Sequence, residues 1–245
     1  MSRRARAVLT AALLTAVLLT AGCGTAPDTV SVERAAAATL ESSRPVLPQR
    51  GPFRHTGRGE FRWSVAPVTA ARLGSSHRAG CPVAVTDLRL VEVTHLGFDG
   101  RPHLGELVVH RTQATAVVEI FRQMYDAHFP VQQMVTVEQY DGDDARSMDA
   151  NNTSAYNCRT TTGGGGFSEH AYGTALDVNP VQNPYVRGTT VEPEAGRAYL
   201  DRSRVRPGMV VADDVVVRAF AAAGWAWGGD FRTLKDYQHF SLSGR

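Results

Sequence analysis

An α+β fold, in which a small antiparallel sheet is flanked by helices, is the class that this 245-residue sequence predicts. Residues 87–96 and 105–110 alternate apolar and polar side chains as half-buried strands do, and the turn residues 98–101 between them predict a hairpin. Residues 112–129 and 213–223 instead carry apolar side chains at helical spacing. With 43% hydrophobic and 20% charged residues, the chain can bury a core, and we expect one main domain with an extension.

The first 22 residues have the pattern of a secretory leader. Arg3, Arg4 and Arg6 form a basic start, and the apolar run that follows is too short for a comfortable membrane span. The leader ends in a segment that looks like a bacterial lipobox, with Cys23 as the residue that receives the lipid. Thr20 stands where the usual leucine would be, so secretion without lipid stays open. We therefore expect export, either as a lipoprotein on the outer face of the cytoplasmic membrane or by secretion to the cell wall.

A flexible tether is expected over residues 23–60, which are rich in Ala, Pro, Arg, Ser and Gly, and the folded domain over residues 61–245. The formal net charge is +2 for the whole chain and falls to about −1 without the three leader arginines. Because no basic patch stands out, we expect no nucleic-acid partner.

The remaining elements of the domain follow from local signals. The helix expected at 112–129 is stopped by Pro130, and residues 134–137 are expected to form the next strand. Asp213 or Asp214 is expected to cap the last helix, which Gly224 ends. After Asp177, a loop with two prolines leads into an insertion that reaches about residue 209 and could form a wall of a cleft.

Three residues have the chemistry of a catalytic zinc site, namely His170, Asp177 and His239. Two imidazoles and a carboxylate can bind one zinc ion and leave a position open for water. Gly173 allows a sharp turn in a strand–turn–strand segment, which would bring His170 and Asp177 together. Asp236 precedes His239 by three residues and can reach the open side of the same metal as a base. Each residue alone is more often structural, so only the set indicates zinc.

The same residues resemble the SxHxxGxAxD signature of the M15 family of zinc D-Ala-D-Ala carboxypeptidases and L-Ala-D-Glu endopeptidases, which includes VanY-like enzymes. The matching positions are Ser168, His170, Gly173, Ala175 and Asp177. Residues 227–231 and 236–240 resemble the family's second block, and the resemblance covers about residues 85–242. It implies the hedgehog/DD-peptidase fold.

The resemblance also implies a role for each site residue. His170, Asp177 and His239 would bind one zinc ion, and Asp236 would be the general base. Many family members carry Glu at the base position, and Asp is one methylene shorter.

An arginine that polarises the scissile carbonyl is the third element that the resemblance implies. Arg159 is the candidate, because its charge is permanent and its donors form a fixed fork, and Arg146 is the reserve. In an exported protein Cys81 and Cys158 most often form a disulfide, which would fix the loop of Arg159. The glycines at 163–166 predict a flexible loop that admits substrate beside His170.

The implied function is a peptidase that acts, as a monomer, on stem peptides of bacterial peptidoglycan. Either a D,D-carboxypeptidase or an L,D-endopeptidase fits these residues. A carboxypeptidase should present an extra cation for the free carboxylate of its substrate, and the insertion offers five: Arg187, Arg197, Arg202, Arg204 and Arg206. The alternative is a noncatalytic, zinc-containing lipoprotein that binds the cell wall or a partner protein.

Overall fold

The computed structural model describes residues 49–50, 54–56, 59–161 and 164–244. The predicted leader, Cys23 and most of the predicted tether lie outside these residues. The part of the tether that is described contains two short strands, β1 (Gln49–Arg50) and β2 (Arg54–Thr56), and the start of β3 (Gly59–Phe61). Within the described ranges, no helix has the length and apolar character needed to cross a membrane.

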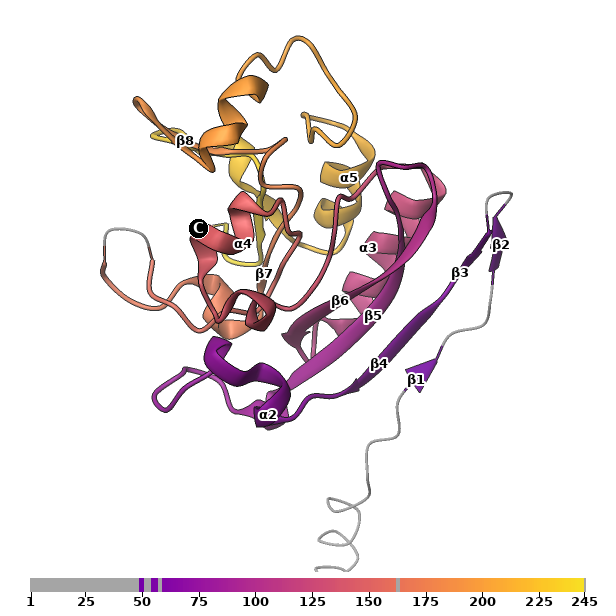
Figure 1. Ribbon diagram of the computed structural model, residues 1–245, viewed down its shortest axis with the longest axis vertical. Helices are drawn as coiled ribbons and strands as arrows, with labels where there is room; N and C mark the ends of the chain where they lie inside the picture. Colours follow the sequence, from indigo (N-terminus) through magenta and orange to yellow (C-terminus); the bar gives the residue numbers. More distant parts are fainter. Residues whose placement is uncertain (1–48, 51–53, 57–58, 162–163, 245) are drawn as a thin grey trace, which may run out of the picture. The chain divides into compact units, whose positions relative to one another are not determined.

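The largest sheet is antiparallel and has the strand order β1-β4-β5-β6 (Figure 1). Its long strands are β4 (Trp63–Pro67), β5 (Leu88–Leu96) and β6 (Pro102–His110). β5 and β6 pair along their full length, so the predicted hairpin is confirmed. β2 and β3 form a separate two-stranded ribbon.

The described α-helices are α2 (Ala70–Leu73), α3 (Ala114–Asp126), α4 (Asp144–Asp149) and α5 (Val215–Ala222). α3 ends earlier than the sequence pattern, because His128 adopts a left-handed conformation (φ 59°) before Pro130. α5 begins as predicted, since the carboxylate of Asp214 accepts a hydrogen bond from the backbone N–H of Val217.

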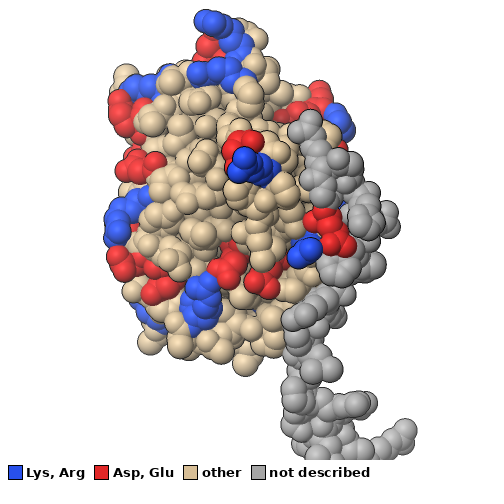
Figure 2. All heavy atoms as spheres, turned by 45° about the vertical axis from the view of Figure 1, so that its right-hand side comes forward, with Lys and Arg blue, Asp and Glu red and all other residues tan. Residues whose placement is uncertain are grey.

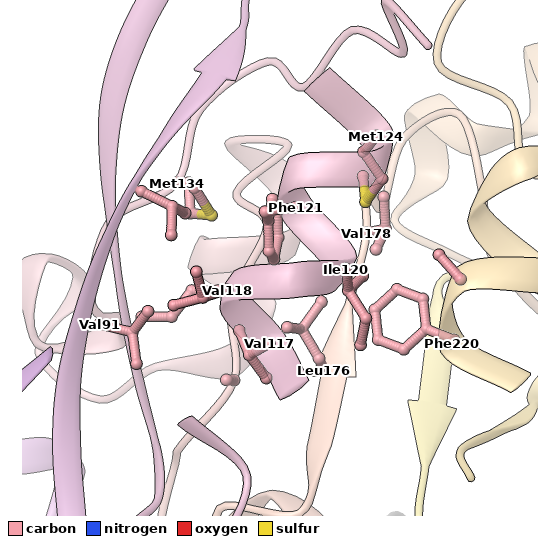
Figure 3. Packing of buried hydrophobic residues seen from close by; sticks show 14 of the residues in the cluster. Val91, Val117, Val118, Ile120, Phe121, Met124, Met134, Leu176, Val178 and Phe220 are labelled. Carbon is pink, nitrogen blue, oxygen red and sulfur yellow. The ribbon is translucent and has the colours of Figure 1, made fainter. Parts of the chain in front are cut away.

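Helix α3 packs between the large sheet and the C-terminal half of the chain. Figure 3 shows Val118 pointing toward Val91 of β5, while Ile120 lies beside Phe220 of α5. All four side chains belong to one continuous buried cluster. This cluster fixes the smaller sheets of the C-terminal half against the hairpin.

Two three-stranded antiparallel sheets make up much of the C-terminal half. One has the order β10-β12-β7 and the other the order β11-β8-β9. Their strands are β7 (Ala175–Asp177), β8 (Tyr185–Arg187), β9 (Thr190–Glu192), β10 (Ala226–Trp227), β11 (Lys235–Asp236) and β12 (His239–Ser241). Small antiparallel sheets with few helices agree with the predicted α+β class. On the face seen in Figure 2, acidic and basic side chains are interspersed.

The strand predicted at 134–137 is wrong. The side chain of Asn152 takes the place of a neighbouring strand there, because its Oδ1 accepts from the N–H of Val135 and its Nδ2 donates to the carbonyl of Val135. A 3₁₀ helix, η3 (Val137–Tyr140), then turns the chain away. One amide side chain can therefore satisfy the backbone hydrogen-bonding groups of a segment whose sequence resembles a strand.

Candidate metal centre and cleft

Strand alternation aims Asp177 and His239 at the same point. Leu176 of β7 and Phe240 of β12 pair across the ladder and are fully buried, and the Phe240 ring stacks on Phe220 at 3.9 Å between centroids. Their neighbours Asp177 and His239 therefore face the other side of the sheet. These two residues are also directly paired across the strands, which brings their side chains together.

His170 comes from a different element than predicted. The first half of the expected strand–turn–strand segment is a 3₁₀ helix, η4 (Glu169–Tyr172). The hydroxyl of Ser168 accepts from the N–H of His170 and so caps this helix, and Gly173 ends it in a left-handed conformation (φ 68°). A Cβ on Gly173 would lie 2.5 Å from the backbone nitrogen of His110, so both the conformation and the space require glycine.

The three donor groups converge closely. Nε2 of His170 lies 3.2 Å from Oδ2 of Asp177 and 3.3 Å from Nδ1 of His239, and Nδ1 of His239 lies 3.0 Å from Oδ1 of Asp177. Donors bound tetrahedrally to zinc at about 2.0–2.1 Å are about 3.3 Å from one another. The spacing of the three donors therefore fits a single zinc-sized ion.

Hydrogen bonding prepares His170 as a ligand. Its Nδ1 lies 2.5 Å from the carbonyl oxygen of Ala155, which can only accept, so Nδ1–H donates and Nε2 presents its lone pair to Asp177 and His239. Burial alone would raise the pKa of Asp177, but when His170 and His239 are protonated, with no metal between them, their charge and hydrogen bonds outweigh burial and hold that pKa well below its usual range. An anionic carboxylate and a free imidazole lone pair in one buried place favour a cation.

Asp236 lies at the edge of this centre, on β11. Its Oδ1 is buried and has no hydrogen-bond partner among the described residues. Burial raises the pKa of Asp236 to about 6, with a further contribution from the negative charge of Asp177. A Cβ on Gly228 would lie 2.5 Å from the carbonyl oxygen of Asp236, so the glycine lets β11 approach. A half-buried carboxylate whose buried oxygen has no partner, beside a candidate metal site, is suited to hold a proton.

Arg159 reaches the same cleft, whereas Arg146 does not. Nε of Arg159 lies 3.0 Å from Oδ1 of Asp144 in a partly exposed ion pair, and its charge lowers the pKa of Asp236. Arg146 is exposed and pairs with Asp141 at 2.8 Å. Asp144 was missed in the sequence, where it is the last residue of an acidic run that looks like an ordinary exposed turn.

The predicted disulfide between Cys81 and Cys158 is present, with Cα atoms 5.9 Å apart. Cys158 is buried and immediately precedes Arg159. The carbonyl of Cys158 also accepts a hydrogen bond from Nη1 of Arg78. The disulfide and this hydrogen bond therefore both hold the backbone immediately before Arg159.

An open cleft of about 580 Å³ joins these groups. The glycine loop contributes Gly165 and Gly166 to its lining, and the insertion contributes side chains from β8 and β9, as expected of a cleft wall. The ionisable lining groups are Asp144, Arg159, Glu169, His170, Asp177, Arg187, Glu192, Asp236 and His239, with the phenols of Tyr172 and Tyr185. Five of these are carboxylates, so the cleft has an acidic bias.

A buried His/Asp/His set that could hold a metal ion and opens onto a cleft, with a carboxylate and an arginine beside it, is typical of metal-dependent hydrolases. Residues 161–242, about a third of the chain, match the family model of D-alanyl-D-alanine carboxypeptidases in peptidase family M15. This match supports the resemblance to the M15 peptidases. No curated protein matches the chain. No solved structure matches it either.

Proposed function

We propose that this chain is a zinc-dependent peptidase that hydrolyses stem peptides of bacterial peptidoglycan. The observation that carries the proposal is the convergence of His170, Asp177 and His239 at the separations of a zinc-ligand set. The family match contains all three residues and supports a peptidase. A VanY-like activity and the hedgehog/DD-peptidase fold belong to the same proposal.

His170, Asp177 and His239 would hold one zinc ion, which would supply Lewis acidity for a water molecule and for the scissile carbonyl. Asp236, with a pKa raised to about 6, would be mostly ionised at neutral pH. Its carboxylate would accept a proton from the attacking water, hold it at the buried edge of the cleft, and donate it to the leaving amine. The close packing of β11 against Gly228 fixes the backbone from which this short side chain extends.

Arg159 would stabilise the negative charge that develops on the carbonyl oxygen. Its guanidinium lines the cleft and is permanently charged, and its Nε forms an ion pair with Asp144. The disulfide at Cys158 keeps the backbone of this arginine in place.

The leader is the basis for the proposed location. Export, with lipidation of Cys23 or secretion to the cell wall, would bring a monomeric enzyme to peptidoglycan. Labelling of growing cells with a fatty-acid probe would test the anchor, because Cys23→Ser should abolish incorporation of the lipid.

The activity is tested by digestion of purified peptidoglycan with the zinc-loaded full-length chain, beside the variants His170→Ala and Asp236→Asn. Loss of one terminal alanine identifies a carboxypeptidase, and separated stem fragments identify an endopeptidase. Both variants should lose the products, but only His170→Ala should also lose zinc. Stoichiometric zinc with no product from any muropeptide would refute the peptidase and favour a noncatalytic wall-binding or partner-binding protein.

A further inference from the structure

The hairpin β8–β9 forms a wall of the cleft next to Asp236. β8 pairs with β11 so that Tyr185 lies directly opposite Asp236, and β9 pairs with β8 so that Glu192 also lies opposite Tyr185. Arg187 is two residues beyond Tyr185, so it shares the same face of this small sheet, about 6.7 Å farther along the strand. Tyr185, Arg187, Glu192 and Asp236 all line the cleft, as this register requires.

Arg187 is a cation without a fixed partner. Its side chain is exposed, and among the described residues no ion pair or hydrogen bond involves its guanidinium. Glu192 shares its face only as a diagonal neighbour, about 7–8 Å away between backbone positions. The guanidinium is therefore available to a ligand.

The other arginines of the insertion have different surroundings. Arg197 pairs with Glu194, and Arg206 stacks on the ring of Tyr199 at 3.6 Å. Arg202 donates to backbone carbonyls and lies over the ring of Tyr237. Arg204 is exposed, and neither it nor the other three lines the cleft.

Within the described part of the chain, only two arginines and no lysine line the cleft, and Arg159 already pairs with Asp144. The acidic bias of the cleft disfavours an anionic group at most other positions. Away from the proposed metal site, Arg187 is therefore the unpaired cation of the cleft wall that a peptide carboxylate can meet, and its planar fork matches a carboxylate with two parallel hydrogen bonds.

We propose that Arg187 is a specificity-determining residue, whose guanidinium binds a carboxylate of the peptide substrate one or two residues from the bond that is cut. Arg187 lies about 6.7 Å along β8 from Tyr185, the residue opposite Asp236. An extended peptide advances about 3.3 Å per residue, so this distance corresponds to about two residues of the substrate. The inference rests on the proposed peptidase function. The carboxylate is either the free C-terminus, as in a carboxypeptidase, or a neighbouring side chain, as in an endopeptidase.

The test uses the full-length zinc-loaded protein and two matched peptide pairs. In the first pair, a five-residue stem peptide ends in D-Ala-D-Ala as the free acid or as the amide. In the second, a side-chain carboxylate beside the cut bond is present as Glu or replaced by Gln. KM and kcat are measured for the wild type, Arg187→Ala, Arg187→Lys and the control Arg204→Ala, which removes an exposed arginine of the same insertion outside the cleft.

We expect Arg187→Ala to raise KM about tenfold to a hundredfold for one pair's carboxylate peptide, with kcat nearly unchanged. The neutral partner of that pair should already have the raised KM in the wild type, with no further loss in the variant. Lysine should restore part of the affinity, and Arg204→Ala should change nothing. The pair that responds identifies the carboxylate. Equal losses on charged and neutral peptides, or no loss, would overturn the proposal.

Binding separates this inference from the proposed function. Dissociation constants for the same peptides are measured by calorimetry on Asp236→Asn, with and without Arg187→Ala. Arg187-dependent binding of the carboxylate peptide, together with a zinc-loaded wild type that cuts no peptide, would refute the peptidase and leave the inference intact. Absence of binding by every peptide would overturn the inference.

Discussion

The contact between Gly228 and Asp236 allows a sharp test of the base. A Cβ at residue 228 would lie 2.5 Å from the carbonyl oxygen and 2.9 Å from the Cβ of Asp236, whereas ordinary contact begins at 3.4 Å. In Gly228→Ala the two segments must therefore separate by about 0.9 Å. A displacement of about 1 Å at a catalytic group can cost about a hundredfold in rate. We expect kcat to fall by about two orders of magnitude and stability to fall by about 1–3 kcal/mol.

The assay compares kcat on a D-Ala-D-Ala peptide with zinc content and thermal unfolding. Zinc should remain stoichiometric, because the proposed metal ligands are on η4, β7 and β12 and not on β11. Gly224→Ala is the matched control: its left-handed φ of 80° makes alanine costly, but a Cβ there meets nothing within 4 Å. This control should lose stability and keep kcat. Wild-type kcat in Gly228→Ala, or equal losses of kcat in both variants, would refute the reasoning.

Three further predictions concern the metal, the arginine and pH. Free zinc at a hundred times its dissociation constant should stabilise the protein by about 2.7 kcal/mol and raise Tm by about 5–10 °C, and Asp177→Asn should lose this shift in calorimetry. Asp144→Asn should lower kcat about tenfold by releasing one edge of Arg159, with a stability change below about 1 kcal/mol because the ion pair is partly exposed; unchanged kcat would contradict a positioning role. Since Asp236 would act as the proposed base only when ionised and its pKa is raised to about 6, kcat/KM should fall as pH drops below about 6, and a flat profile from pH 5 to 8 would contradict this.

The sequence was informative where a local pattern determines the structure. Alternation in 87–96 and 105–110 predicted β5 and β6, and the capping aspartate before residue 215 predicted the start of α5. His170, Asp177 and His239 were grouped by residue type and motif, and the structure brings them together. Chemistry-bearing residues at motif spacing are thus visible without coordinates.

Features that depend on contacts distant in sequence were not predictable. A short segment such as 134–137 looks like a strand, but Asn152 satisfies its backbone. The 3₁₀ helix at His170 is capped by the hydroxyl of Ser168, and an alternation of apolar and polar residues does not predict such a cap. Asp144 is distinguished by its ion pair with Arg159, and Arg187 by its position in the cleft wall. Five arginines of the insertion were equivalent in the sequence, and the register of β8 against β11 is what distinguishes Arg187.

The bond between Cys81 and Cys158 spans 77 residues and ends next to Arg159. Cross-links of this kind form in oxidising compartments and are rare in a reducing cytosol. A copy that stays inside the cell would therefore keep its zinc ligands but hold the arginine segment by hydrogen bonds alone. The arrangement of the segment that carries Arg159 would then depend on the redox state of the compartment and not only on whether the chain has folded.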